Sequence, residues 1–398
     1  MINRIKYIAQ IRPFYESDLI KVITGIRRCG KSVVLEQIKN ELASQGKHIV
    51  YLNFEDRRVS ASITTDLELT EYVENELLAN HNEKLYVFLD EVQMVKNWNL
   101  ACRSLRLQNI SLFITGSNSK LLSREFTKEL SGRYISFTIR PFVYKEIVEY
   151  AKELGRGVSV NDYLVYGGFP KRFEFQGQED MLRYLNDLDE TIVLNDIINR
   201  YNIRKQEIFK KLANYVLMSN ARIFSSNSVY RYLKSQKTDC SINTVMKYID
   251  YLEEAYVVRK LPQYSTKAKK QLEFYTKLYD EDVAFNSIRQ PNNRFDITHN
   301  LENVVYNELV YMGYSLTVYN VNDKEIDFLA VKNGHEYLVQ VAYSVVEEST
   351  YKREFAAFNE LDNSRKKILI TNDENDFSTS TIQHIRLADF LKMNDLEG

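Results

Sequence analysis

The first part of the chain, up to about residue 145, alternates short continuous apolar runs with amphipathic segments. The apolar runs read LIKVITG, HIVYLNFED, LYVFLDEV, ISLFITGS and YISFTIRPF. Continuous runs of this kind, separated by helical patterns, are typical of parallel strands buried on both faces of a sheet. The pattern therefore predicts an α/β core with a parallel sheet over residues 1–145.

The rest of the chain divides into three predicted segments. Over residues 146–204 the apolar positions follow a helical period, interrupted at YGGFP, where two glycines and a proline break a helix; we expect a helical segment. Residues 205–283 read as helix, helix, polar turn, helix and strand, the order of a winged helix-turn-helix, followed by a lysine-rich linker. Residues 284–398 read as a helix, three strands, a helix and a further strand, which predicts a smaller α/β domain.

Composition and charge change this picture only modestly. The 398-residue chain has 53 Lys and Arg against 54 Asp and Glu, so attraction to nucleic acid or an acidic membrane has to come from local patches. No apolar run approaches the roughly 20 residues that cross a bilayer, and the first ten residues lack the apolar core of a secretory signal. Cys29, Cys102 and Cys240 lie far apart without metal-ligand spacing, which argues against a disulfide scaffold or a zinc site. We expect a cytoplasmic protein without a membrane partner.

A glycine-rich loop joins the first predicted strand to a helix. It matches the pattern G-x-x-x-x-G-K-[ST], which ends in Lys31 and Ser32. Glycines let the backbone wrap a phosphate closely, and the loop N–H groups and the helix N-terminus attract negative charge. Lys31 is expected to reach the β and γ phosphates, and the Ser32 hydroxyl to bind Mg²⁺. The predicted cofactors are ATP and Mg²⁺, held by Gly25, Ile26, Arg27, Arg28, Cys29, Gly30, Lys31, Ser32 and Val33.

The variable positions of the loop keep two interpretations open. Arg27 and Arg28 are placed either to meet phosphate or to contact a neighbouring acidic residue, while Cys29 is expected only to fill space. Adenine recognition leaves little sequence signature and no N-K-x-D motif stands in a suitable place. The sequence therefore does not decide between ATP and GTP.

Two acidic residues follow the apolar strand LYVFLDEV. Because the carboxyl ends of parallel strands share one edge of the sheet, Asp90 and Glu91 are expected beside the phosphate loop. Asp90 is suited to hold Mg²⁺ through its water shell, and Glu91 to orient or deprotonate the attacking water. An acid pair after a strand also arises by chance, but its combination with the phosphate loop favours catalysis.

Two later segments supply further candidates. Ser117 and Asn118 follow the strand ISLFITGS, where they are placed to touch the γ-phosphate or the lytic water; the alternative is a helix N-cap or a turn. Arg133, in LSGRY, is a candidate to stabilise charge on the transferring phosphoryl group, in cis or across a subunit contact. A surface arginine in a loop is the competing interpretation of Arg133.

Several of these segments together resemble the AAA+-type ATPases of prokaryotes that carry a C-terminal domain of unknown function. The segments of the core are IKVITGIRRCGKSVVLEQI, YLNFED, VFLDEVQ, LFITGSNSKLLS, ELSGRY and IRPFVYKEI, and those of the C-terminal module are YLVYGGFP, SINTVMKYIDYLEEAYVVRKLPQY and YLVQVAYS. The resemblance covers nearly the whole chain. It implies ATP binding and hydrolysis by a core with a helical lid, then a winged helix and a domain similar to the PD-(D/E)XK nucleases. It implies no known substrate.

The segment of residues 205–270 is locally basic. It contains 13 Lys and Arg against 5 Asp and Glu, an excess of eight positive charges (13 − 5) that suits a phosphate backbone. Ser241 is predicted to cap the recognition helix, and Asn243, Thr244 and Lys247 lie on its first turns, where such helices read base edges. One expected partner is therefore double-stranded DNA. The alternative is a protein partner or a second copy of the chain, because winged helices also dock proteins and a basic face is often only solvated.

The last segment carries part of a nuclease active site. A PD-(D/E)XK site needs a helix acid, a strand-end Asp, and an acid-x-Lys on the next strand, so that carboxylates bind Mg²⁺ and the lysine assists water. Glu302 and Asp327 stand in the first two positions, but Gln340 and Ala342 replace the second acid and the lysine. We predict a nuclease-like scaffold without nuclease activity. The spacing of Lys332 and Lys352 supports neither as a substitute.

These observations lead to two functional hypotheses from different classes. The first is a Mg²⁺-dependent ATPase in which the nucleotide state controls the winged helix and the C-terminal domain. The second is a nucleotide-gated switch that binds DNA or protein with little turnover. A third interpretation, an active ATP-dependent nuclease, is opposed by Gln340 and Ala342.

Overall fold

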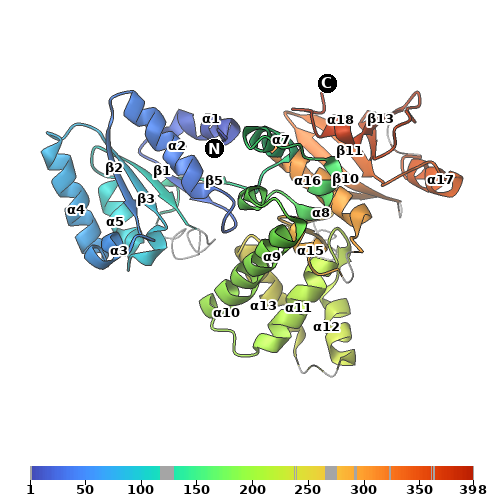
Figure 1. The fold of residues 1–398 in the computed structure, drawn as a ribbon, viewed down its shortest axis with the longest axis horizontal. Helices are drawn as coiled ribbons and strands as arrows, with labels where there is room; N and C mark the ends of the chain where they lie inside the picture. Colours follow the sequence, from blue (N-terminus) through green and yellow to red (C-terminus); the bar gives the residue numbers. More distant parts are fainter. Residues whose placement is uncertain are drawn as a thin grey trace. The chain divides into compact units, whose positions relative to one another are not determined.

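The molecule divides into two units by its internal contacts. The first unit comprises residues 1–141 with 254–256, and the second comprises residues 142–253 with 257–398. Each unit is described by itself below, with its elements labelled as in Figure 1. The computed structural model describes residues 2–116, 130–236, 238, 240–264, 276–290, 294–321, 324–359, 361 and 364–397.

The first unit is built on a five-stranded parallel sheet of order β2-β3-β4-β1-β5. Every residue of its three central strands is buried, because helices cover both faces there. This confirms the predicted α/β core, with the parallel sheet typical of P-loop NTPases. The strands are β1 (Ile20–Thr24), β2 (His48–Asn53), β3 (Leu85–Asp90), β4 (Ile110–Thr115) and β5 (Tyr134–Thr138).

Alternating side chains of the strands divide the core of this unit between two helical layers. Leu85, Val87 and Leu89 of β3 belong to one buried cluster with the apolar faces of α4 and α5. Phe88, between them in sequence, points to the opposite face, where its ring stacks on Phe113 at a centroid distance of 4.6 Å. The helices of this unit are α1 (Ile5–Ile11), α2 (Lys31–Ser44), α3 (Arg57–Ser62), α4 (Asp66–Ala79) and α5 (Trp98–Leu105).

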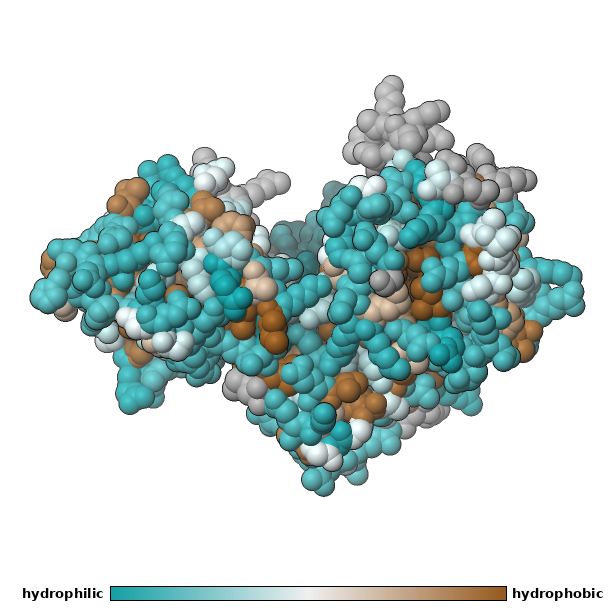
Figure 2. Space-filling view, turned by 90° about the horizontal axis from the view of Figure 1, so that it is seen from above, coloured by the Kyte–Doolittle hydropathy of each residue, from teal (hydrophilic) through white to brown (hydrophobic). Residues whose placement is uncertain are grey.

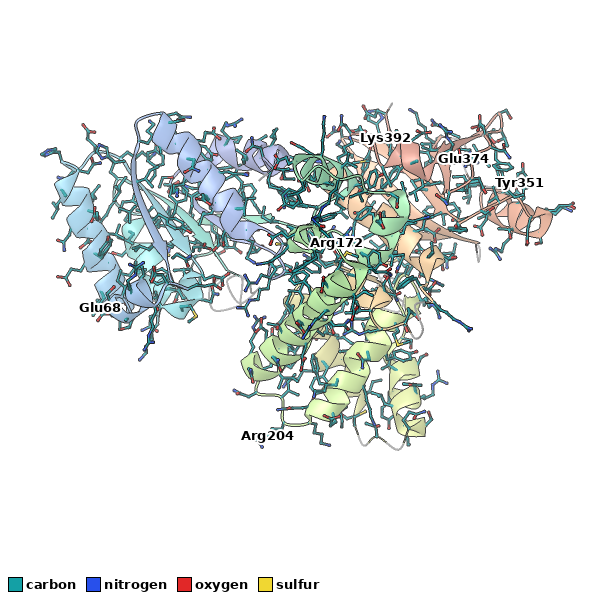
Figure 3. All side chains as sticks on the ribbon, in the orientation of Figure 1. Glu68, Arg172, Arg204, Tyr351, Glu374 and Lys392 are labelled. Atoms are coloured by element: carbon teal, nitrogen blue, oxygen red, sulfur yellow. The ribbon has the colours of Figure 1, made fainter. Side chains whose placement is uncertain are left out.

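The second unit begins with a helical segment that breaks at the predicted YGGFP turn. Gly167 has φ +66°, and a Cβ there would lie 1.5 Å from Asp282 Oδ1, so only glycine fits. Asp282 accepts the Gly168 N–H at 2.7 Å, and Arg172, labelled in Figure 3, donates from Nε to the Gly167 carbonyl at 2.8 Å. The helices are α7 (Tyr144–Glu153), α8 (Val160–Tyr166), α9 (Gln178–Asp189), a π-helix (Glu190–Asp196) and α10 (Ile197–Arg200).

A small antiparallel sheet of order β6-β8-β7 follows, interleaved with helices. The helices and the strand that the sequence predicts are present in the predicted order, and α13 begins one residue after Ser241; the predicted turn KTDC lies partly outside the described residues. Ser241 Oγ accepts the Thr244 N–H at 3.2 Å, as a capping side chain does. The elements are α11 (Gln206–Met218), β6 (Ile223–Phe224), α12 (Ser226–Ser235), α13 (Ile242–Glu254), β7 (Val258–Leu261), β8 (Thr276–Asp280) and α15 (Ala284–Ser287).

The chain ends in a separate mixed sheet of order β13-β12-β11-β10-β9. Strands β9, β10 and β11 pair antiparallel, whereas β11, β12 and β13 run parallel. The smaller α/β domain is therefore present, with one strand and one short helix, β13 and α18, beyond those that the sequence pattern indicates. The elements are α16 (Ile297–Met312), β9 (Ser315–Val321), β10 (Lys324–Lys332), β11 (His335–Val341), α17 (Glu348–Ala356), β12 (Lys366–Thr371), β13 (Ile382–Arg386) and α18 (Leu387–Phe390).

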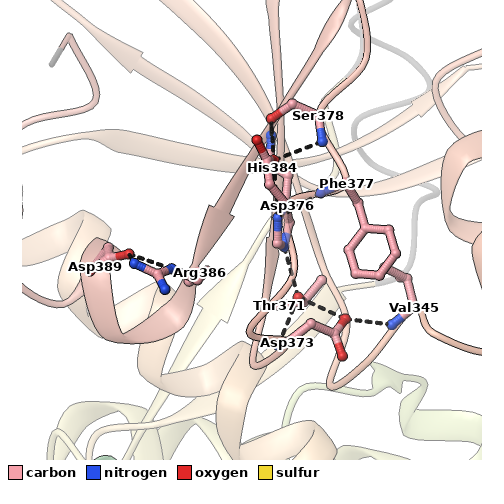
Figure 4. Close-up of polar contacts among 9 residues, drawn as sticks. All are labelled: Val345, Thr371, Asp373, Asp376, Phe377, Ser378, His384, Arg386 and Asp389. Carbon is pink, nitrogen blue, oxygen red and sulfur yellow. Dashed lines mark hydrogen bonds and ion pairs between the residues drawn. The ribbon is translucent and has the colours of Figure 1, made fainter.

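A buried histidine holds the loop between β12 and β13 (Figure 4). His384 Nδ1 accepts the Phe377 N–H at 3.2 Å, which places the ring proton of the neutral imidazole on Nε2. That proton faces Thr371 Oγ1 at 2.8 Å, and the Thr371 hydroxyl donates to Asp373 at 3.0 Å. The chain of three hydrogen bonds fixes one tautomer of His384, and burial lowers its pKa.

The surface is mostly hydrophilic on the face shown in Figure 2, with scattered hydrophobic residues. Within the described ranges, none of the helices combines the length and the hydropathy that a membrane crossing needs. Cys29, Cys102 and Cys240 are free thiols.

Candidate functional site

The loop between β1 and α2 is shaped by its two glycines. Gly25 has φ +138°, and a Cβ there would lie 2.0 Å from the Ile139 carbonyl oxygen, so the loop passes too close to the neighbouring backbone for any other residue. Gly30, with φ +100°, starts α2 in the left-handed region. The backbone thus turns tightly and directs the N-terminus of α2 at the loop, an arrangement that favours an anion.

Residues outside the motif hold this loop in place. Arg4 donates from Nη1 to the Cys29 carbonyl at 3.1 Å and from Nη2 to the Arg140 carbonyl at 2.9 Å. The Cys29 thiol lies 3.3 Å from the Ile139 carbonyl oxygen. Cys29 is therefore a packed residue that ties the loop to the segment after β5, in keeping with its expected role as a filler.

Lys31 is almost fully buried at the start of α2. Its Nζ donates to the carbonyl oxygens of Gly25 at 3.2 Å and Ile26 at 3.1 Å. These are neutral acceptors, so the ammonium lies inside the curve of the loop without a carboxylate among the partners that hold it there. A phosphate oxygen is a stronger acceptor for an ammonium than a carbonyl is.

Asp90, the last residue of β3, meets the loop directly. Its Oδ1 accepts the Ser32 hydroxyl at 3.2 Å, and its Oδ2 accepts the Tyr51 hydroxyl at 3.1 Å. The Thr115 hydroxyl also donates to Oδ1. Because Asp90 is 1% exposed, these bonds compensate the desolvation of its carboxylate and fix its orientation toward Ser32.

Glu91 follows in a left-handed conformation, with φ +55°. Its backbone N–H donates to Thr115 Oγ1 at 3.0 Å, and its carboxylate accepts the side-chain amide of Gln93. The unusual backbone angle turns the Glu91 side chain away from the strand direction. Such a conformation costs about 1–3 kcal/mol, and the Thr115 bond helps to hold it.

Three contributors to this site escape the sequence motifs: Thr115, Tyr51 and Arg4. Thr115 ends β4 and Tyr51 lies in β2, the two strands that flank β3. Their position at the same carboxyl edge as Asp90 follows only from the strand order. The available signal was weak: Thr115 is a polar residue at the end of a mostly apolar strand.

The remaining predicted residues of the loop have ordinary surroundings. Arg27 Nη2 lies 3.9 Å from the Glu55 carboxylate, which is the acidic-neighbour interpretation of the two left open. Arg28 is exposed with φ +67°, Ile26 is buried, and Val33 lies half-buried in the first turn of α2.

Arg133 lies at the other edge of the sheet. Its carbonyl oxygen accepts the Ile20 N–H at 3.0 Å, at the start of β1, whereas the phosphate loop follows the end of that strand. The parallel pairing thus separates Arg133 from Asp90 by the length of a strand within one chain. Ser117 and Asn118 lie outside the described residues.

The predicted recognition helix borders a surface pocket of about 300 Å³. The pocket lies between the first turns of α13 and the loop after α10, where Figure 3 labels Arg204. Among the described residues that line it, none is acidic. The rings of Tyr201 and Tyr251 stack at 3.6 Å, and Lys247 Nζ lies 5.7 Å from the Tyr251 ring centroid. Asn243 and Thr244 complete its polar lining.

The predicted nuclease positions come together in the second unit. Glu302 lies in α16, Asp327 in β10, and Gln340 and Ala342 at the end of β11. Asp327 Oδ2 accepts the Val341 N–H at 3.0 Å, and the Gln340 side-chain oxygen accepts the Asp327 N–H at 3.2 Å. Lys332 and Lys352 pair elsewhere, with Asp395 and Glu348.

Descriptions of known protein families match three parts of the chain. The description "AAA domain" matches residues 17–148, and two domains of unknown function, DUF8612 and DUF4143, match residues 158–288 and 298–390. The first unit is thus an AAA-type P-loop domain.

Two relatives match over most of their own length. An uncharacterized protein of Haemophilus influenzae is 33% identical over 381 residues, covering 93% of each chain, and the chain belongs to its family. The uncharacterized protein MJ1544 of Methanocaldococcus jannaschii is 32% identical over 89% of this chain and 82% of its own.

Solved structures show weaker similarity. AMPPCP-bound DnaA from Aquifex aeolicus is 16% identical, with a TM-score of 0.32, over 63% of this chain and 88% of that chain. The replication initiator DnaA bound to AMPPCP and single-stranded DNA is 17% identical, with a TM-score of 0.33, over the same shares. Scores of this size carry no argument about function.

Proposed function

We propose that the protein binds ATP with Mg²⁺ and hydrolyses it at the loop of residues 25–32. The observation that carries this proposal is the contact of 3.2 Å between the Ser32 hydroxyl and the Asp90 carboxylate. A hydroxyl and a carboxylate beside a phosphate loop are the oxygen ligands that Mg²⁺ prefers. The tight passage at Gly25 and the buried ammonium of Lys31 fit a triphosphate at the same place.

Each residue has a defined part in this reaction. Lys31 leaves the two loop carbonyls and binds phosphate oxygens, while Ser32 and Asp90 hold the metal, which neutralises charge on the phosphates when bound. Glu91 orients the attacking water and accepts its proton. Thr115 acts through both acids, because its hydroxyl touches the Asp90 carboxylate and the Glu91 N–H.

Two variants separate hydrolysis from binding. Glu91→Gln is expected to retain ATP while phosphate release falls by about 10²–10⁴-fold, since it removes the proton acceptor. Lys31→Ala is expected to lose ATP binding. Lys84→Ala is a control at the opposite edge of the sheet: Lys84 pairs with Glu16 at the surface, and its loss should leave both unchanged.

The alternative function is a nucleotide-gated switch with little turnover. Both functions predict ATP binding, and they differ in phosphate release by the native protein. Phosphate release by the native protein that is no faster than that of Glu91→Gln, both with and without DNA, would favour the switch. If Lys31→Ala and Ser32→Ala both still bound ATP as the native protein does, both functions would be refuted.

The proposed output of the nucleotide state is the second unit, read as a winged helix followed by a nuclease-like domain. The order α11, β6, α12, α13, β7, β8 and its three-stranded antiparallel sheet support the winged-helix interpretation. The order of α16 and the strands after it, with Glu302 and Asp327 brought together, supports the nuclease-like interpretation. Gln340 and Ala342 argue against cleavage.

Double-stranded DNA is the partner that the pocket beside α13 favours. Two cationic side chains, Arg204 and Lys247, stand beside polar groups on the first turns of α13. Two of the three acids of the same helix, Asp250 and Glu253, are held by Lys260 at 2.6 and 2.8 Å. These two acids are thus paired with a lysine other than Lys247 of the pocket.

DNA binding can be measured across a salt series. Replacing Arg204 and Lys247 by alanine is expected to weaken binding and to reduce the salt slope by about one per residue. Lys352→Ala, on α17, removes an exposed lysine outside the basic segment and serves as the matched control. An unchanged slope in the double variant would favour a protein partner or a second copy of the chain. In that case Arg133, at the amino edge of the sheet, is the residue to test across a subunit contact.

A further inference from the structure

One buried lysine of the second unit is surrounded by carboxylates. Lys277 Nζ, on β8, lies 3.1 Å from Glu302, 2.9 Å from Glu325 and 2.9 Å from Asp327. The residue is 5% exposed. The carboxylates come from α16 and β10, so a side chain from one sheet enters an acidic cluster beside another sheet.

Glu302 and Asp327 have further hydrogen-bond partners besides Lys277. Tyr279 donates its hydroxyl to Glu302 at 2.7 Å, and the second oxygen of Asp327 accepts the Val341 N–H at 3.0 Å. The Gln340 side chain accepts the Asp327 N–H and donates to Glu354 at 2.8 Å. Lys277 is the group through which Glu302, Glu325 and Asp327 are joined.

Electrostatics require a cation at this position. The side chains of Glu302 and Asp327 are only 12% and 9% exposed, and that of Glu325 is 31% exposed. Two carboxylates close together and largely away from water, with a third beside them, are unstable unless positive charge compensates them. The ammonium donates hydrogen bonds to Glu302 at 3.1 Å and to Asp327 at 2.9 Å, and it forms an ion pair with Glu325 at 2.9 Å. The neighbouring carboxylates raise the pKa of Lys277 against the effect of burial, so the ammonium stays charged.

We propose that Lys277 is the resident cation of this acidic cluster and occupies the place that a divalent metal takes in a metal-dependent nuclease site. Glu302 and Asp327 are the two acids that a metal-dependent nuclease site would use, and the ammonium lies between them. A metal ion and Lys277 Nζ therefore exclude each other. The same contact joins β8 to the C-terminal sheet, so the cluster serves as a structural link between the two sheets of this unit.

The sharpest test removes the charge of Lys277 and keeps an unbranched side chain of similar length. Lys277→Met is expected to lower the thermal unfolding midpoint by on the order of 10 °C, because the carboxylates lose their compensating charge. Lys260→Met is the matched control: Lys260 lies in the same small sheet and also pairs with two acids, Asp250 and Glu253 of α13, but these pairs are more exposed, and such pairs contribute little. Its midpoint should change by no more than about 2 °C.

A metal titration then tests whether Lys277 Nζ occupies the position of a metal ion. Without nucleotide, Mn²⁺ is expected to raise the midpoint of Lys277→Met and to leave that of the wild type unchanged. Adding Asp327→Asn to Lys277→Met should abolish the rise. These measurements need no ATP, so their outcome is independent of the proposed hydrolysis.

Several results would overturn the proposal. One is an effect of Lys277→Met as small as that of Lys260→Met, and another is no Mn²⁺-dependent rise in Lys277→Met. If Lys277→Met does not fold, the wild type still decides, by Mn²⁺ binding measured in the wild type and in Asp327→Asn. Loss of Mn²⁺ binding in Asp327→Asn would show that a metal shares the site with Lys277, and so would Mg²⁺-dependent DNA cleavage by the wild type that needs Asp327. Equal Mn²⁺ binding by both proteins, without cleavage, would support the proposal that Lys277 excludes a metal.

Discussion

Replacing Thr115 by valine should damage the phosphate site without touching the phosphate loop. Valine keeps the shape of threonine, so the packing of β4 is preserved and only the hydroxyl is lost. That hydroxyl donates to Asp90 and accepts the Glu91 N–H at 3.0 Å. The substitution therefore removes one bond to a charged group and leaves one backbone donor without this acceptor.

The expected magnitude follows from these two bonds. A hydrogen bond to a charged group contributes about 1.5–3 kcal/mol, and a buried donor without an acceptor costs about 1–3 kcal/mol. Because neighbouring effects are not additive, we expect a loss of unfolding free energy of about 2–4 kcal/mol. Groups that orient a metal ligand typically alter activity by about 10–100-fold, so phosphate release should fall by that factor. ATP affinity should change little, since Lys31 and the loop N–H groups are untouched.

Urea denaturation and phosphate release at saturating ATP measure the two effects of Thr115→Val. Thr24→Val is the matched control, because Thr24 is also a buried threonine at a strand end of the same sheet. Its hydroxyl contacts are long, at 3.4 and 3.5 Å, and none involves an acid. Equal stability and equal phosphate release in the two variants would refute the role assigned to Thr115.

Three further predictions concern the second unit. Burial raises the pKa of Glu308 to about 7 and that of Asp282 to about 6, so the folded state keeps protons that the unfolded chain has released. Stability should therefore fall as pH rises from about 4.5 to 7. In Glu308→Gln, the midpoint of urea denaturation should depend less on pH over that range. The lowered pKa of His384 acts in the other direction, because protonation of Nδ1 removes the acceptor for the Phe377 N–H; His384→Gln should reduce the loss of stability below about pH 6.5. Gly167→Ala should destabilise by more than about 3 kcal/mol, since its Cβ would collide with Asp282, whereas Gly157→Ala, with no atom within 4 Å, should be nearly neutral in the same assay.

The parts of the fold that the sequence predicts are those with local physical causes. The central strands of the first unit are mostly apolar because both of their faces are buried, and that pattern needs no knowledge of neighbours. The glycines at positions 25 and 30 have positive φ angles, which is a local requirement, whereas the close approach of Gly25 to the Ile139 backbone joins segments far apart in sequence. The phosphate loop and the acidic strand end could therefore be identified, and Ser32 and Asp90 are in contact.

Other features depend on contacts that no local pattern records. Lys21 interrupts an apolar strand, yet it is fully buried, with its ammonium 2.8 Å from Ser111 Oγ and over the Phe113 ring. Thr115 joins the site only because β4 lies beside β3. Lys277 is 50 residues from Asp327 in sequence and belongs to a different sheet, so a search at fixed spacing from the acids could not find it.

The contrast between two buried lysines connects the two proposals. Lys31 is held by two neutral carbonyl oxygens at 3.1 and 3.2 Å, partners that a phosphate can replace with a gain in electrostatic energy. Lys277 is held by three carboxylates, and its withdrawal would leave their buried negative charge without compensation. The same type of side chain is therefore suited to exchange partners in the first unit and to stay fixed in the second. It follows that the phosphate loop can respond to nucleotide, whereas the acidic cluster serves to hold two sheets together.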